Sequence, residues 1–163
     1  MKLAIISDIH DHIPNLEKAL PQAADCDALI CCGDLNSPFV AKALGEGYRG
    51  PIHVVFGNND GDRFRIAAIG SQFDQITFHG EYAELELDGK QFAIQHFDNI
   101  GRGLAKGEAF DVVCFGHNHQ FELSKVGRTQ IINPGEILGL LSGTATFVKY
   151  DTTTGEAEKI VVA

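Results

Sequence analysis

The chain has 163 residues, a length typical of one domain and sufficient to bury a hydrophobic core. Its formal net charge of −9 argues against binding to long nucleic acids or anionic membranes, because such binding requires many Lys and Arg side chains. The sequence shows neither a signal-peptide pattern nor an apolar run of the roughly 18 residues that a membrane span needs. We therefore expect a soluble, cytoplasmic protein whose residues 1–163 form one domain.

Short apolar runs alternate with helical patterns over the first 70 residues. Pro14 is in the favoured first turn of a helix, and Leu16 and Leu20 lie one helical turn apart. The pattern predicts strands over 3–7, 28–32 and 52–56 and helices over 14–20, 39–44 and 62–69. Such an alternation is typical of parallel β-α-β units.

Strand patterns dominate the rest of the chain. They predict strands over 73–78, 81–87, 91–95, 112–115, 121–125, 129–133, 144–150 and 158–162, with no element assigned to 96–111. Asp88-Gly89 and Gly127 lie between neighbouring strands and indicate hairpins, as does the turn at 151–155. The sequence thus predicts two packed sheets with helices outside.

The four cysteines, which are Cys26, Cys31, Cys32 and Cys114, form no CxxC pair. No disulfide framework is implied, because the chain is not a short secreted one. Cys31 and Cys32 lie in an apolar run, and we expect their thiols to fill a core.

Polar residues follow five of the apolar strands at their carboxyl ends. They occur in Ser7-Asp8-Ile9-His10, Gly33-Asp34-Leu35-Asn36, Gly57-Asn58-Asn59-Asp60, His96, and Gly116-His117-Asn118-His119. In α/β sheets, binding sites form just beyond the carboxyl ends of the strands. The sequence therefore predicts one site built from all five segments.

The residue types at these strand ends are those of a metal centre. Residues two apart in an extended segment project to the same side, so Asp8 and His10 should reach one metal, and His117 and His119 one cleft. Carboxylate, amide and imidazole without thiolate suit Mn²⁺, Fe, Zn²⁺, Ni²⁺ or Co²⁺. A shared Asp can bridge two cations about 3.5–4 Å apart, as in two-metal hydrolytic sites.

The order DxH, GDxN, GNxD, H and GHxH over residues 8–119 resembles the calcineurin-like metallophosphoesterase superfamily. The opening SDIHDHIPNLEKAL and the later Asn133-Pro134-Gly135 resemble its small bacterial and archaeal phosphodiesterases. The resemblance implies an α/β fold, a four-layer αββα sandwich with two mixed β-sheets flanked by helices. It also implies two divalent metal ions, with Mn²⁺ as the first expectation.

The resemblance further implies how the residues share the two metals. Asp8, His10, Asp34 and His119 would hold one, and Asp34 would bridge to the second, which Asn58, His96 and His117 would complete. A metal-bound hydroxide would then attack the phosphorus of a small phosphorylated substrate. The candidate catalytic residues are Asp34, Asn58 and Asn59.

Several positions depart from the family pattern. Asn59 occupies the position where many members have a His that protonates the leaving group, so we expect a preference for diesters or esters with good leaving groups. Asp11 and Glu136 stand where Gly and Ser are frequent, and Asp98 follows His96 in place of a residue that often faces substrate. Asp60 is expected to cap a helix or support a ligand. Asp11, Asp60 and Asp98 are therefore candidates for contact with substrate or with the ligands.

Two other functions fit the same scaffold. One is a metal-binding interaction scaffold with weak or no catalysis, as in the eukaryotic retromer subunit of this fold, and retention of all seven ligands argues against it. The other is a phosphomonoesterase or nucleotide hydrolase, which would need basic side chains for a terminal phosphate. Arg63, Arg65 and Arg102 are near the motifs in sequence. The oligomeric state, the native metal and the physiological substrate stay open.

Overall fold

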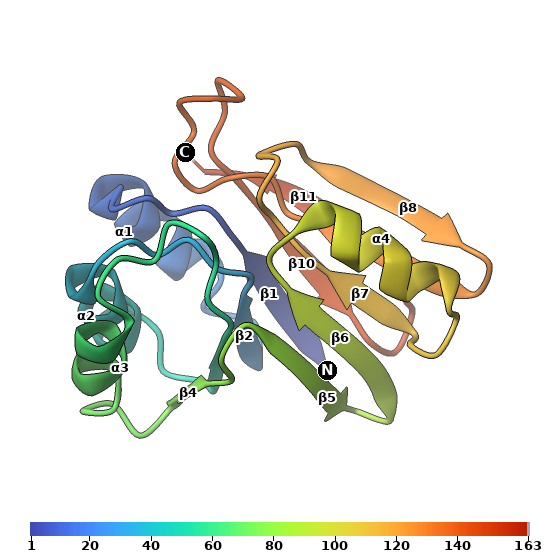
Figure 1. Ribbon diagram of the computed structural model, residues 1–163, viewed down its shortest axis with the longest axis horizontal. Coiled ribbons are helices and arrows are strands. Elements are labelled where there is room, and N and C mark those ends of the chain that lie inside the picture. The colour runs from blue at the N-terminus through green and yellow to red at the C-terminus, as the bar shows by residue number, and fades with distance from the viewer. Residues whose placement is uncertain (163) are drawn as a thin grey trace.

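Two mixed β-sheets form the centre of the computed structural model, which describes residues 1–162 (Figure 1). The first sheet has the order β11 (Ala157–Val161), β10 (Thr146–Asp151), β1 (Lys2–Ile6), β2 (Ala28–Cys31), β3 (Ile52–Val54) and β4 (Ile76–Phe78). The second has the order β5 (Tyr82–Leu87), β6 (Lys90–Gln95), β7 (Val112–Cys114), β9 (Thr129–Asn133) and β8 (Glu122–Val126). Strands β1 to β4 are parallel to one another, and so are β6, β7 and β9.

Helices cover the outer face of each sheet. Three of them, α1 (Ile13–Gln22), α2 (Pro38–Gly47) and α3 (Arg63–Gly70), belong to the first sheet, and α4 (Asp98–Lys106) lies on the second. None of the helices in residues 1–162 is long and apolar enough to cross a membrane.

The hydrophobic core is divided into three parts, one for each interface between layers. Along β1, Ala4 and Ile6 pack with the helices, whereas Leu3 and Ile5 pack between the two sheets. This alternation follows from the period of two in a strand, and it is possible only because both faces of β1 are covered. The expected four-layer αββα sandwich with two mixed β-sheets is therefore confirmed.

The predicted hairpins and free thiols are confirmed. Strands β5 and β6 pair antiparallel around Asp88 and Gly89, whose φ angles of 52° and 74° suit the tight turn that this dipeptide favours. Strands β8 and β9 pair around Gly127, and β10 and β11 around the turn at 151–155. All four cysteines are free and buried, and burial raises the pKa of Cys26 to about 11.

Two expectations about elements are wrong. Strand β4 begins at Ile76 rather than at residue 73, because Phe73 instead packs against the core beside Gly45 of α2. Helix α4 occupies part of the stretch to which the sequence assigned no element. Its two glycines, Gly101 and Gly103, lower its intrinsic helix propensity, and the packing of its buried face on the second sheet compensates.

The two glycines of α4 should respond in opposite ways to alanine. A Cβ at buried Gly101 would lie 2.3 Å from the Phe115 ring, so Gly101→Ala should lower the free energy of unfolding by about 1–3 kcal/mol. A Cβ at exposed Gly103 meets nothing within 4 Å, so Gly103→Ala should raise it by about 0.5–1 kcal/mol. Urea unfolding monitored by circular dichroism checks both, and equal effects would contradict the close packing of α4 against Phe115.

Candidate metal centre

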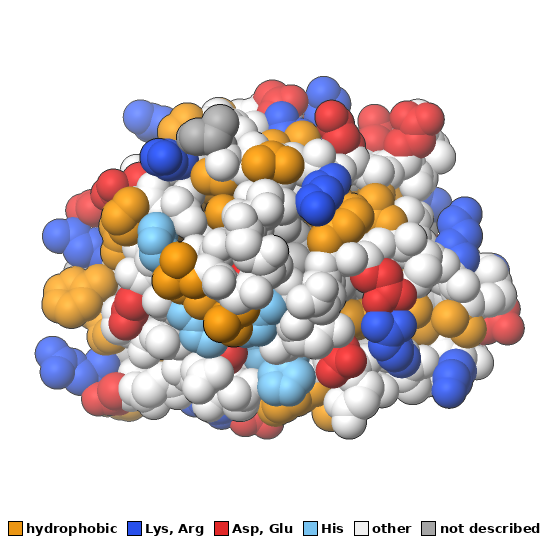
Figure 2. All heavy atoms as spheres, turned by 90° about the horizontal axis from the view of Figure 1, so that it is seen from above, with side chains coloured by type: hydrophobic (Ala, Val, Ile, Leu, Met, Phe, Trp, Pro, Cys, Tyr) orange, Lys and Arg blue, Asp and Glu red, His pale blue; other side chains and the backbone are white. Residues whose placement is uncertain are grey.

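The five polar segments meet at one edge of the molecule. Strands β1, β2 and β3 of the first sheet and β6 and β7 of the second carry these segments just beyond their carboxyl ends. Figure 2, which views the molecule from above this edge, shows histidine side chains gathered near the middle of the face. Two aspartates of the segments lie below the molecular surface, since Asp8 is fully buried and Asp34 is 1% exposed.

The backbone of these segments is left-handed at five of the seven candidate ligands. Asp8, His10, Asp34, His117 and His119 have φ angles between 47° and 71°. Six of the nine non-glycine residues with positive φ lie in the five segments, and a seventh, Asp11, directly follows one of them, so backbone strain is concentrated at this site. The sequence predicts that an extended backbone places Asp8 and His10 on the same side of the chain. The two side chains do lie together, but the backbone at both residues is left-handed, so the predicted extended conformation is wrong. Left-handed residues turn the chain sharply and bring the side chains together.

One group of possible metal ligands consists of Asp8, His10 and His119, whose ligand atoms lie within 4.8 Å of one another. The Nε2 atoms of His10 and His119 are 3.7 Å and 3.6 Å from Oδ1 of Asp8. The two imidazole rings stack with their centroids 5.0 Å apart. Both rings thus present a nitrogen to the same carboxylate oxygen.

A second group consists of Asp8, Asp34 and His96. Nε2 of His96 is 3.3 Å from Oδ2 of Asp34 and 3.0 Å from Oδ1 of Asn58. The same Oδ2 of Asp34 lies 3.5 Å from Nε2 of His10, so Asp34 lies between the two groups. The His117 ring belongs to neither group, but its centroid lies 5.1 Å from that of His96. The structure thus brings together all seven residues that the resemblance implied as ligands.

Hydrogen bonds orient two of the imidazoles. Nδ1 of His96 lies 2.8 Å from the carbonyl oxygen of Cys32, and Nδ1 of His119 lies 2.7 Å from Oε2 of Glu136. A carbonyl or carboxylate oxygen only accepts hydrogen bonds, so each Nδ1 carries the hydrogen and each Nε2 faces the other candidate ligands. This arrangement is the one in which a histidine binds a metal through Nε2. The contact of Glu136 was missed from the sequence, where this residue is only a departure from the family pattern.

The electrostatics of the cluster suit a cation. Burial raises the pKa of Asp34, but the neighbouring His96 side chain and the hydrogen bonds from Asn59 outweigh this and hold it well below the usual range. The pKa of His10 is raised, and the largest cause is the neighbouring Asp8 carboxylate. Oδ1 of Asp8 and Nε2 of His10 are buried without a hydrogen-bond partner among residues 1–162, which is costly unless a ligand satisfies them. Divalent cations would satisfy both atoms, and the donor set fits them.

The residues flanking the ligands hold the loops in place. The backbone N–H and side-chain amide of Asn59 donate to the two oxygens of Asp34, at 2.8 Å and 3.0 Å. Asp60 accepts hydrogen bonds from backbone N–H groups of the loops that follow β2 and β3, namely those of Asp34, Leu35, Asn36 and Gly57. The expected alternative that Asp60 caps a helix is wrong, because Asp62 is the N-cap of α3.

Asp11 and Asp98 lie around the same site. Asp11 accepts a hydrogen bond from the Ser37 hydroxyl, which links the loop after β1 to the start of α2. Asp98 is the first residue of α4, and the side-chain amide of Asn118 lies 3.5 Å from its carboxylate. Asn118 is itself held by Asn133 at 2.9 Å. Both aspartates thus connect loops near the histidines.

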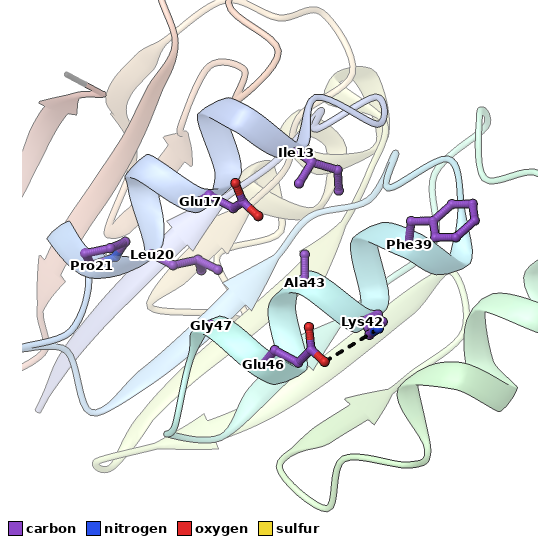
Figure 3. Close-up of a pocket in the computed structure, with 9 residues that line it drawn as sticks. All are labelled: Ile13, Glu17, Leu20, Pro21, Phe39, Lys42, Ala43, Glu46 and Gly47. Atoms are coloured by element: carbon purple, nitrogen blue, oxygen red, sulfur yellow. Dashed lines mark ion pairs between the residues drawn. The ribbon is translucent and has the colours of Figure 1, made fainter.

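A separate groove of about 530 Å³ runs between α1 and α2 (Figure 3). Its walls are mainly apolar, with Leu20 from α1 and Phe39 from α2, and Lys42 pairs with Glu46 at 3.7 Å. None of its lining residues belongs to the two groups of candidate metal ligands. The groove is therefore separate from the candidate metal centre.

Comparisons with known proteins identify the family of the chain. A family model described as the calcineurin-like phosphoesterase superfamily domain matches residues 1–155. The chain is 34% identical over 166 residues to phosphodiesterase MJ0936 of Methanocaldococcus jannaschii, covering 99% of each protein. It is 29% identical over 147 residues to phosphodiesterase YfcE of Escherichia coli K12, covering 84% of this chain and 79% of the relative.

Solved structures show the same fold. The structure of an archaeal phosphodiesterase matches with a TM-score of 0.92 at 32% identity, covering 99% of both chains. Vps29 from Entamoeba histolytica matches with a TM-score of 0.70 at 17% identity over the whole of both chains, which shows the fold alone. With the family model spanning nearly the whole sequence, the chain belongs to the calcineurin-like phosphoesterase superfamily.

Proposed function

We propose that the protein is a two-metal phosphodiesterase that hydrolyses a small phosphate diester. The observation that carries the proposal is the place of Asp34 between two groups of ligand atoms, where one carboxylate can serve two cations. The phosphodiesterase names of the archaeal and bacterial relatives support the same reaction. Asp8, His10 and His119 would hold one cation with Asp34, and Asn58, His96 and His117 would hold the other.

The protein's own residues prepare the site for this chemistry. Bound divalent cations would lower the pKa of a coordinated water, orient the phosphate and stabilise the charge that develops on it. Asn59 holds both oxygens of Asp34 and so fixes the carboxylate between the two groups. A neutral amide cannot supply a proton to the leaving group, so the reaction should favour esters whose leaving groups depart as stable anions.

Two arginines that are near the motifs in sequence, Arg63 and Arg102, are paired with carboxylates, which argues for a diester rather than a monoester. Arg63 lies 2.5 Å from Glu81 and donates to the carbonyl oxygen of Gly57 at 2.7 Å. Arg102 forms a two-point ion pair with Glu122. Both guanidinium groups are therefore engaged by carboxylates, and neither is placed to bind the additional negative charge of a monoester.

The space beside the metal centre suits a small substrate. A hollow of about 240 Å³ adjoins His119 and is lined by polar residues, including Thr144 and Lys159. A space of this size accepts one small polar substituent of the phosphate. Mn²⁺ is the proposed metal because oxygen and imidazole ligands suit it, and Fe, Zn²⁺, Ni²⁺ and Co²⁺ fit the same donors.

The test is hydrolysis of bis(p-nitrophenyl) phosphate by protein that has been stripped of metal and then supplied with Mn²⁺. We expect turnover that depends on added metal, with kcat/KM higher for this diester than for p-nitrophenyl phosphate. A higher value for the monoester would favour the phosphomonoesterase alternative. No turnover with Mn²⁺, Ni²⁺, Co²⁺ or Zn²⁺ would favour a metal-binding scaffold instead.

A further inference from the structure

Glu136 is a fully buried carboxylate that contacts a candidate metal ligand. Its Oε2 lies 2.7 Å from Nδ1 of His119. Its Oε1 accepts hydrogen bonds from the backbone N–H of Ser142 at 2.5 Å and from the Ser142 hydroxyl at 2.7 Å. Both carboxylate oxygens are thus occupied by donors, and Glu136 supports His119 without facing the candidate cations itself.

The backbone around Glu136 is anchored to the loop that carries Asp8. The N–H groups of Ile137 and Leu138 donate to the carbonyl oxygens of Ser7 and Asp8, each at 3.0 Å. The carbonyl oxygen of Glu136 accepts from the N–H of Thr146 at 2.9 Å, which ties the segment to β10. The position of the Glu136 carboxylate relative to Asp8 and His119 is therefore fixed by the sheet rather than by a free loop.

We propose that Glu136 is a positioning residue that holds His119 in the orientation and tautomer needed to bind the cation shared with Asp8 and His10, and so strengthens that site. The proposal rests on the proposed metal centre. A carboxylate bound to the far nitrogen of a ligating histidine fixes the ring and makes it a stronger donor, and loss of such a partner typically costs about 10–100-fold in metal affinity.

Only a carboxylate satisfies the donors on both sides of residue 136. His119 offers an N–H to one oxygen, and Ser142 offers an N–H to the other. A Gln at this position has one oxygen and one NH₂ group. If its oxygen faces His119, its NH₂ meets the N–H of Ser142. If its NH₂ faces His119, the imidazole must take the other tautomer, and its Nε2 then carries a hydrogen that blocks the metal.

The experiment is calorimetric titration of the metal-free protein with Mn²⁺, comparing wild type with Glu136→Gln. We expect one of the two binding steps to weaken by about 10–100-fold and the other to change little. The matched control is Glu158→Gln, which removes the same charge from an exposed position on β11 and should leave both steps unchanged. Nitrogen NMR of the metal-free proteins adds a direct readout, since His119 should carry its hydrogen on Nδ1 in wild type and lose that preference in Glu136→Gln.

Equal Mn²⁺ affinity in folded Glu136→Gln and wild type would overturn the proposal, as would an unchanged His119 tautomer. If Glu136→Gln does not fold, Glu136→Asp provides the same test, because the shorter carboxylate keeps its charge but withdraws from His119 and should also weaken one step. Binding is measured without substrate, so the two proposals can fail separately. If the wild type binds two Mn²⁺ ions but hydrolyses no diester, the proposed function is refuted and the role of Glu136 in metal binding is not.

Discussion

Asp34→Asn should abolish metal-dependent hydrolysis, lowering kcat/KM for bis(p-nitrophenyl) phosphate by about 10³-fold or more, which corresponds to roughly 4 kcal/mol of lost transition-state stabilisation. Oδ2 of Asp34 lies 3.3 Å from Nε2 of His96 and 3.5 Å from Nε2 of His10. An amide at this position carries no charge, and only one of its two terminal atoms can bind a metal. The variant therefore loses the group that links the two proposed cations.

The measurement for Asp34→Asn combines metal analysis of the purified protein with the diester assay. Asp74→Asn is the matched control, because it makes the same chemical change at an exposed position in the loop before β4. The control should retain wild-type metal content and turnover. An Asp34→Asn protein with wild-type metal content and activity would remove Asp34 from the proposed centre.

Asp60→Asn should lower the free energy of unfolding of the metal-free protein by about 2–4 kcal/mol. Oδ1 of Asp60 accepts from the N–H groups of Leu35 and Asn36, and Oδ2 accepts from those of Asp34 and Gly57. An amide in place of this carboxylate directs its NH₂ at two of the four N–H groups whichever way it is turned. Those donors stay buried without an acceptor, and the loops that carry Asp34 and Gly57 separate more easily.

Urea unfolding in the presence of EDTA measures this effect free of stabilisation by bound metal. Asp62→Asn provides the comparison, since Asp62 is the N-cap of α3 and Asn is about as good a cap as Asp. Its stability should stay within about 0.5 kcal/mol of wild type. A loss in Asp60→Asn no larger than that in Asp62→Asn would show that the four hydrogen bonds do not determine the stability of these loops.

Much of the fold is predictable from the sequence, because local pattern and tertiary context agree over most of the chain. Leu3 and Ile6 belong to an apolar run that a strand with two covered faces requires. Asp88-Gly89 specifies a tight hairpin through backbone conformations that few other pairs adopt. Helix α4 is the exception, because Gly101 is favoured there by its contact with Phe115, a residue distant in sequence.

The order of the motifs predicts which residues belong to the candidate site, but it does not predict the hydrogen bonds that orient those residues. The position of Asp34 follows from its place after a buried strand, whereas the contact between Glu136 and His119 joins residues on separate loops. No local pattern marks Glu136 as a partner of an imidazole. The tautomers of His96 and His119 likewise depend on a carbonyl and a carboxylate that only the folded chain brings near.

The left-handed backbone in the loops that carry the candidate metal ligands also affects how these sequences can change during evolution. Asp and His are among the few non-glycine residues that tolerate positive φ, and they are also the proposed metal ligands at positions such as Asp8, Asp34 and His117. Selection for correct folding and selection for metal binding therefore favour overlapping sets of residues. A descendant that lost catalysis would still be favoured to keep Asp, Asn or Gly in these turns, so that traces of the motif would outlast the activity.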